Sequence, residues 1–117
     1  MSIPVDDRGL LLGDGLFETL LWRDGALVDF ESHVDRMRRG CAVLGLPAPA
    51  VDRLADAGAR AVRDAGLASD RAAVRLTWTA GSGGRGLDRP AAPEPRLFAS
   101  AAPSPAVVGE CALATSA

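Results

Sequence analysis

The sequence of 117 residues contains no lysine, and its 13 basic residues are all arginines. A guanidinium stays protonated near neutral pH and has no free electron pair, so no side chain of this chain can attack an aldehyde as an amine nucleophile. The sequence also has no tyrosine, only one histidine and only two cysteines.

The two cysteines, Cys41 and Cys111, are far apart in the sequence and form no CxxC motif, and His33 is the single histidine. This pattern argues against a disulfide and against a metal site, which needs several close ligands. We expect both cysteines to fill space in the core.

Charge and hydropathy exclude several further classes. The net charge is −2 and 48% of the residues are hydrophobic, which is typical of a folded domain and not of a disordered chain. The arginines are scattered among 15 acidic residues, which argues against a nucleic-acid partner. No stretch approaches the roughly 18 apolar residues of a membrane span, and the amino terminus lacks the pattern of a signal peptide. We therefore expect a cytoplasmic protein of one domain, or a part of a larger protein.

The first strands are predicted around a turn at Asp24-Gly25, a dipeptide typical of two-residue β-hairpins. Residues 16–22 before it carry apolar side chains on both faces, and residues 26–28 follow it. The sequence therefore predicts a buried β-hairpin in this region.

Three later segments are also expected to be strands. In residues 74–79 the side chains of Val74, Leu76 and Trp78 alternate with polar ones, which indicates a strand with one buried face. Residues 97–101 form another short strand, and residues 111–115 begin a further one.

Helical spacing predicts two helices between these strands. We expect Asp29 to cap a helix that begins near Phe30 and ends before Gly45, and a second helix to run from about residue 50 to about residue 65, with Gly66 after its end. The predicted fold is α/β of the α+β kind, a mostly antiparallel sheet with two helices.

Two motifs in this fold have a functional and a purely structural interpretation. The glycine-rich stretch 81–86 can bind an anion through backbone N–H groups, with Arg85 adding charge, or it can be an ordinary flexible turn. It matches neither the P-loop nor the dinucleotide-binding pattern. His33 and Arg36 are three residues apart on one helix face, so they can share a ligand or lie side by side in solvent.

Several short segments occur in a characteristic order along the chain. They are, in order, Asp7-Arg8-Gly9, Gly13-Asp14-Gly15-Leu16-Phe17-Glu18-Thr19, His33-Val34-Asp35-Arg36, Leu44-Gly45-Leu46, Arg75-Leu76-Thr77 and Gly81-Ser82-Gly83-Gly84-Arg85-Gly86. With these segments in this order, the sequence is similar to the amino-terminal part of the class IV aminotransferases, the fold-type IV pyridoxal-phosphate enzymes, which include branched-chain aminotransferases, D-amino-acid aminotransferases and aminodeoxychorismate lyases.

This resemblance implies roles for three residues. Arg36 resembles the arginine that binds the 5′-phosphate of pyridoxal phosphate, and an arginine–phosphate pair is a strong, charge-assisted one. Phe17 resembles a residue that lines the substrate pocket. Arg85 resembles a loop arginine that, in some members, crosses a homodimer interface to hold the carboxylate of the small-molecule substrate.

The sequence also departs from the family pattern. Ala80 stands where an arginine is common, and the tyrosine often found near Phe17 in D-amino-acid enzymes is absent. The family's Schiff-base lysine belongs to a second domain. The resemblance therefore implies that residues 1–103 are a small amino-terminal domain, and that residues 104–117 are a linker and the first strand of a missing carboxy-terminal domain. This chain alone would then be inactive and would hold no cofactor covalently.

The glycine-rich stretch is most similar to that of the aminodeoxychorismate lyases, which release pyruvate to leave 4-aminobenzoate. The favoured function is thus the amino-terminal segment of such a lyase. A branched-chain or D-amino-acid aminotransferase is the alternative. A further alternative is a non-catalytic module that binds an anion or a partner through Arg36 and Arg85.

Overall fold

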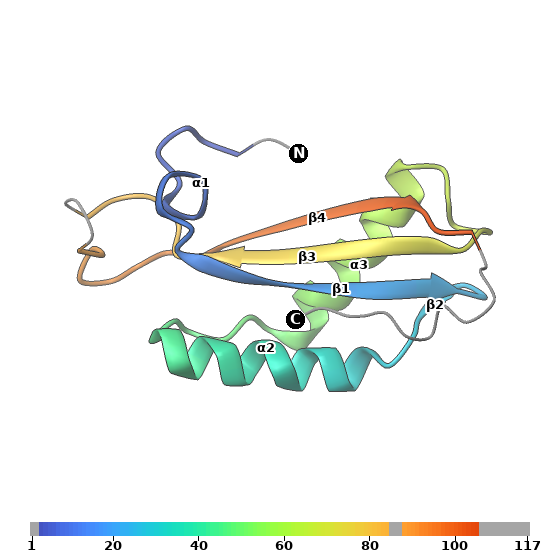
Figure 1. Ribbon diagram of the computed structural model, residues 1–117, viewed down its shortest axis with the longest axis horizontal. Coiled ribbons are helices and arrows are strands. Elements are labelled where there is room, and N and C mark those ends of the chain that lie inside the picture. Colours follow the sequence, from blue (N-terminus) through green and yellow to red (C-terminus); the bar gives the residue numbers. More distant parts are fainter. Residues whose placement is uncertain (1–2, 85–87, 106–117) are drawn as a thin grey trace.

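The computed structural model describes residues 3–84 and 88–105 (Figure 1). One four-stranded sheet has the strand order β2-β1-β3-β4, and its three pairings are antiparallel. The elements in chain order are α1 (Arg8–Leu12), β1 (Gly15–Arg23), β2 (Ala26–Leu27), α2 (Phe30–Leu44), α3 (Val51–Asp64), β3 (Ala72–Thr79) and β4 (Arg96–Pro103). The predicted antiparallel sheet is confirmed.

The core lies between one face of the sheet and the two longer helices. Helix α2 contacts β1, while α3 contacts β3 and β4 (Figure 1). Burial of apolar surface in this layer stabilises the fold, at roughly 25 cal/mol per Å² removed from water. The buried residues of this core are Leu20, Val34, Met37, Cys41, Leu46, Leu54, Val62, Val74, Leu76, Trp78 and Ala80.

The predicted hairpin is present, but only one of its faces is buried. Asp24 and Gly25 both adopt positive φ, 53° and 78°, as the tight two-residue turn requires. Leu20 is 2% exposed beneath the helices, whereas Phe17, on the opposite face of β1, is 41% exposed. The expectation of a buried hairpin is therefore wrong for the face that α2 does not cover.

Both predicted helices form, with one error at a helix start. Gly45 follows α2 with a φ of 72°, and Gly66 follows α3 with a φ of 73°, so the predicted ends are confirmed. Asp29 precedes α2, but its backbone has a φ of 54° and its side chain makes no capping hydrogen bond. A capping residue typically has a β-region backbone, which Asp29 lacks, so the predicted side-chain cap is wrong.

Helix α1 was not expected. Asp7 caps this five-residue helix by accepting a hydrogen bond from the Gly9 amide at 2.7 Å, and Gly13 ends it with a φ of 66°. Its leucines are exposed, since Leu10, Leu11 and Leu12 are 56%, 63% and 43% accessible. A helix so short has no helical period that a sequence could reveal.

Strand β4 is longer than predicted because it continues to Pro103, at a sheet edge where a missing amide donor is tolerated.

Cys41 is 1% exposed in the core, as predicted, and burial raises the pKa of its thiol. Cys111 and the strand expected at residues 111–115 lie outside the described residues. Within the described part of the chain, no helix has both the length and the apolar character of a membrane span.

Candidate functional site

Strand β1 and helix α2 bring three ionisable side chains together. The Glu18 carboxylate lies 2.6 Å from His33 Nδ1 through Oε1, and 3.7 Å from Arg36 Nε through Oε2. Glu18 is 5% exposed, so it is a buried charge that needs such partners. The predicted sharing of a helix face by His33 and Arg36 is confirmed, and both side chains turn toward β1.

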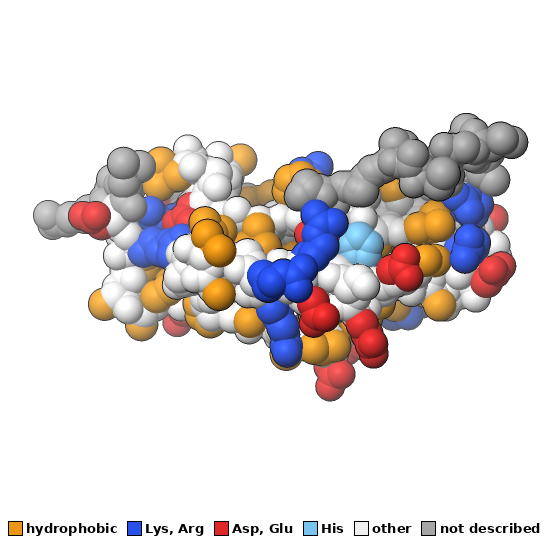
Figure 2. All heavy atoms as spheres, turned by 60° about the horizontal axis from the view of Figure 1, so that its bottom comes forward, with side chains coloured by type: hydrophobic (Ala, Val, Ile, Leu, Met, Phe, Trp, Pro, Cys, Tyr) orange, Lys and Arg blue, Asp and Glu red, His pale blue; other side chains and the backbone are white. Residues whose placement is uncertain are grey.

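Glu18 was not singled out as a functional residue, although it lies inside the Gly-Asp-Gly-Leu-Phe-Glu-Thr motif. Its alternation with Phe17 places it on the helix-covered face, where a carboxylate is unusual. A carboxylate on the buried face of a strand was therefore the sequence signal that could have identified Glu18 as a functional residue. The Arg36 side chain remains 39% exposed beside it, so the guanidinium is oriented by Glu18 and still reaches the surface. Figure 2 shows basic and acidic side chains gathered across the middle of the face that α2 forms.

The opposite face of the sheet carries a cavity of about 470 Å³ beside α1. Phe17 lines it together with Arg75 and Phe98, and its role in a substrate pocket stays a prediction. The register explains this grouping, because Phe17 pairs with Thr77, and Thr77 pairs with Phe98. The remaining lining residues are Ile3, Gly9, Leu10, Gly13, Gly15, Leu16, Thr77 and Thr79.

Arg75 gives this cavity a positive charge. Its guanidinium carbon lies 3.9 Å from the centre of the Phe17 ring, a cation–π distance. Arg75 belongs to the Arg75-Leu76-Thr77 segment of the family resemblance, but the sequence assigned it no role in the site. An arginine held flat on an aromatic ring can bind a carboxylate with the edge of its guanidinium.

The glycine-rich stretch begins directly after β3. Arg85 lies outside the described residues, so its predicted contact with a substrate carboxylate stays a prediction. Gly81 and Gly84 have φ values of 79° and 84°, and a Cβ on them would lie 2.1 Å from Glu94 O and 1.9 Å from Asp88 O. Glycine is thus required at both positions by backbone packing inside this chain.

Two clusters attach this stretch to the start of the chain. In the first, Asp7 is fully buried and accepts hydrogen bonds from Thr79 Oγ1 at 2.9 Å and from Arg96 Nη1 at 3.0 Å. Thr79 Oγ1 in turn accepts one from the Gly81 amide at 3.1 Å. Thr79, expected on the polar face of its strand, is therefore buried because Asp7 is a partner for its hydroxyl.

The second cluster is centred on Asp14. Arg89 binds the carboxylate with two hydrogen bonds of 2.6 Å and 2.9 Å, and Arg8 Nε adds a third of 2.9 Å. The hydrogen bond from Arg89 is the main cause that lowers the pKa of Asp14 from its ordinary 3.8 to about 2, against the opposing effect of burial. The same bond raises the pKa of Arg89.

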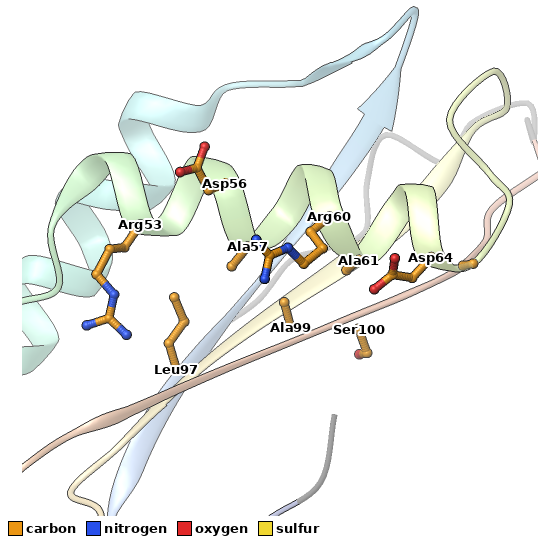
Figure 3. A pocket seen from close by; sticks show the side chains of 10 residues that line it. Arg53, Asp56, Ala57, Arg60, Ala61, Asp64, Leu97, Ala99 and Ser100 are labelled. Carbon is orange, nitrogen blue, oxygen red and sulfur yellow. The ribbon is translucent and has the colours of Figure 1, made fainter.

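A further hollow of about 520 Å³ lies between α3 and β4 (Figure 3). Arg60 and Asp64 project from α3 toward β4 there, and Leu97 and Ala99 form its floor. None of the family motifs falls in this hollow. It is larger than the Phe17 cavity, but its opposite charges alternate along one helix, so it offers no net charge to a ligand.

Comparison with known proteins points to one family. The family model described as amino-transferase class IV matches residues 15–110. A curated relative, assigned as a branched-chain-amino-acid aminotransferase of Methanocaldococcus jannaschii, is 33% identical over 110 residues, which cover 93% of this chain and 38% of the relative. The chain thus spans little more than a third of the length of that relative.

Solved structures show the same relation. The 4-amino-4-deoxychorismate lyase of Pseudomonas aeruginosa is 36% identical with a TM-score of 0.74, over 94% of this chain and 39% of that one. A hypothetical aminotransferase of Mycobacterium tuberculosis, solved in a form with bound pyridoxal phosphate, is 30% identical with a TM-score of 0.74, over 90% and 35%.

Proposed function

The chain belongs to the class IV aminotransferases, and from this premise we propose that it supplies the phosphate-binding and substrate-binding part of a pyridoxal-phosphate enzyme. The observation that carries this proposal is the Glu18–His33–Arg36 cluster, in which two separate family motifs meet. The resemblance that named Arg36 as a phosphate ligand thereby gains a physical basis.

The residues present fit the phosphate end of the cofactor. Arg36 stands at the surface, and its contact with the buried Glu18 limits the orientations of its guanidinium. A preoriented arginine loses less entropy when it forms a bidentate pair with a phosphate. His33 adds a second polar group on the same helix face, next to the same carboxylate. We propose that Arg36 binds the phosphate and that Glu18 orients Arg36.

The residues present do not fit the aldehyde end of the cofactor. When bound, pyridoxal phosphate supplies an aldehyde that condenses with amines and a ring that withdraws electrons from the adjoining carbon. Since the sequence contains no lysine, no side chain in it can hold that aldehyde covalently. We propose that the lysine belongs to a second domain, that residues 1–103 are the small domain, and that residues 104–117 lead to the second.

This assignment has a direct chemical test. Borohydride reduction of the 117-residue chain mixed with pyridoxal phosphate should label no internal position, because no lysine is available, and only the terminal amine should react. Peptide mass spectrometry locates the adduct. A stoichiometric adduct at an internal residue would contradict the proposal that the covalent cofactor attachment belongs to a second domain.

The substrate side of the proposal rests on the Phe17 cavity. Phe17 presents its ring to the cavity, and Arg75 places a cation against that ring. This lining suits a small substrate with a carboxylate and an apolar part. We further propose a homodimer, in which Arg85 approaches the substrate carboxylate of a neighbouring subunit.

Among the family's activities we propose the aminodeoxychorismate lyase reaction, which releases pyruvate and leaves 4-aminobenzoate. The glycine-rich stretch 81–86 supports it, as does the 36% identity to the Pseudomonas aeruginosa lyase. The second candidate is transamination of branched-chain amino acids, which the 33% identity to the Methanocaldococcus jannaschii protein favours.

Assays of the protein expressed from the complete gene distinguish these candidates. With aminodeoxychorismate we expect release of pyruvate and 4-aminobenzoate in equal amounts, dependent on added pyridoxal phosphate. Consumption of a 2-oxo acid with leucine, without pyruvate release, would favour the transaminase. Neither activity, together with no change in cofactor absorbance, would favour the non-catalytic binding module.

A further inference from the structure

Helix α1 forms one side of the Phe17 cavity, and the proposed cofactor and substrate contacts leave this helix without a role. Gly9 and Leu10 line the cavity from α1, whereas Phe17 and Arg75 line it from β1 and β3. Figure 1 shows α1 at the end of the sheet where β1 begins. A ligand in the cavity is therefore within reach of the helix as well as of the strands.

Leu10 is the side chain through which α1 takes part in this cavity. The other leucines of the helix, Leu11 and Leu12, do not line it, and Gly9 has no side chain. Leu10 is 56% exposed, so more than half of an apolar side chain meets solvent at the cavity. An apolar group of a ligand that covers this surface removes it from water, which favours binding.

Polar contacts of Asp7 hold α1 in place, while its leucines stay exposed. The carboxylate of Asp7 is fully buried and accepts hydrogen bonds from the Gly9 amide, from Thr79 Oγ1 and from Arg96 Nη1. Thr79 itself lines the cavity. The start of α1 is thus attached to β3 and β4 at the cavity.

Gly9 allows the backbone of α1 to come close to β3. A Cβ on Gly9 would lie 2.9 Å from Thr79 Cβ, so a larger residue would displace Thr79. The Arg8 amide also donates to Gly81 O, directly after β3, at 2.6 Å. These contacts fix the backbone next to Leu10 without a ligand, and a preformed wall loses little entropy when a ligand binds.

The cavity has a charged part and an apolar part. Among the described residues that line it, Arg75 is the one with a charged side chain, and its guanidinium lies on the Phe17 ring. Leu10, Ile3 and Phe98 contribute apolar side chains. This division suits a ligand with a carboxylate at one end and an apolar chain at the other.

We propose that Leu10 is a specificity-determining residue, which contacts the apolar part of the substrate and favours substrates in which this part is longer. This inference rests on the proposed function, in which the Phe17 cavity holds a small substrate with a carboxylate. Because Asp7 and Gly9 fix α1 against β3, Leu10 stays in place when the ligand is short, and a longer ligand covers it.

The test measures how two straight-chain carboxylates, propanoate and hexanoate, bind to the enzyme expressed from the complete gene. Dissociation constants come from titrations followed by ligand-detected NMR, which needs no turnover. The variants are Leu10→Ala, which removes most of the side chain, and Leu10→Met, which keeps an apolar side chain of similar size. Leu11→Ala is the matched control, because Leu11 is the next residue of α1, is 63% exposed and does not line the cavity.

We expect the wild-type enzyme to bind hexanoate more tightly than propanoate. Leu10→Ala should reduce this preference by about fourfold or more, the effect of about one buried CH2 group, through weaker binding of hexanoate. Leu10→Met and Leu11→Ala should both keep the preference, and sedimentation velocity reports any change in self-association separately. The melting temperature and the affinity for pyridoxal phosphate should not change in Leu10→Ala, because Leu10 is largely exposed and is not part of the Arg36 cluster.

A preference for hexanoate that Leu10→Ala leaves unchanged would overturn the proposal, and so would an equal loss in Leu11→Ala or in Leu10→Met. A wild-type enzyme that binds both acids equally would overturn it as well. If neither acid binds to the wild-type enzyme with saturation, the substrate side of the proposed function fails. That result is distinguishable from a preference that no Leu10 variant alters, which refutes the role of Leu10 alone.

Discussion

At the residue scale, Arg36 carries the clearest expectation for cofactor binding. In the complete enzyme, Arg36→Ala should weaken the affinity for pyridoxal phosphate by about tenfold to a hundredfold, because a charge-assisted pair contributes about 1.5–3 kcal/mol. Titration of the apoenzyme with the cofactor, followed by absorbance, measures this. Arg38→Ala is the control, since Arg38 is exposed two positions further along α2. Equal losses in both variants would remove Arg36 from the phosphate site.

A second expectation at this scale concerns acid stability. The pKa of Asp14 is about 2 in the folded chain and near 3.8 when unfolded, so its stabilising effect is fully present above about pH 5 and is lost as the pH falls toward about 2. The difference in unfolding free energy between wild type and Asp14→Asn should therefore shrink over that range. Urea denaturation at several pH values measures it. The difference for Asp24→Asn should stay constant; an Asp14→Asn difference that also stays constant would contradict the assignment.

At the element scale, the close packing of the glycine-rich stretch 81–86 at Gly81 predicts how much free energy of unfolding an alanine there would cost. Gly81 and Gly25 have φ values of 79° and 78°, but a Cβ on Gly81 would meet Glu94 O at 2.1 Å, whereas nothing lies within 4 Å of one on Gly25. Alanine at either position carries the left-handed backbone cost of about 1 kcal/mol. Gly81→Ala should cost a further roughly 1–3 kcal/mol from overpacking.

Equilibrium denaturation of the two variants measures this difference. The comparison isolates the close approach, because both glycines have nearly the same positive φ. If both variants lose the same free energy of unfolding, then the contact between residues 81 and 94 does not constrain the segment.

The elements that could be predicted from the sequence are those with local signals. Asp24-Gly25 marked the hairpin, alternation marked β3, and Gly45 and Gly66 marked helix ends, because each signal depends on residues close together in the chain. Helix α1 was missed since five residues are too few to show a period. The predicted Asp29 cap was wrong because Asp29 has a left-handed backbone instead of the β-region backbone typical of a capping residue, and its side chain makes no capping hydrogen bond.

The site could be predicted only in part, for the same reason. The spacing of His33 and Arg36 is local, so their shared face was visible. Their partner Glu18 comes from β1, and the partner of Asp14, Arg89, is 75 positions away. Such contacts form only when the sheet brings distant strands together, so no local sequence pattern predicts them.

At the scale of the whole molecule, exposed apolar surface predicts self-association. Trp78 is not part of this surface, because its side chain is 3% exposed beneath the helices. The exposed apolar side chains instead include Val5 and the leucines of α1, of which Leu11 is 63% accessible. Clusters of this kind are typical of surfaces that another protein surface covers.

We therefore expect the 117-residue chain to associate with itself as its concentration rises. Leu11→Arg should shift it toward the monomer in sedimentation velocity experiments. Val43→Arg is the control, because Val43 is 85% exposed and belongs to a different helix, α2. A wild-type chain that stays monomeric at high concentration, or an equal shift in both variants, would contradict this.

The two tryptophans give the chain a built-in optical report of its folding. Without tyrosine, its intrinsic fluorescence comes almost entirely from Trp78, which donates through Nε1 to Pro47 O at 2.9 Å, and from Trp22, which donates to Ala68 O at the far end of the sheet. A dissolved quencher such as iodide would reach the partly exposed indole of Trp22 long before the buried one of Trp78. Emission spectra recorded with the quencher would therefore distinguish local unfolding at the hairpin end of the sheet from unfolding of the core.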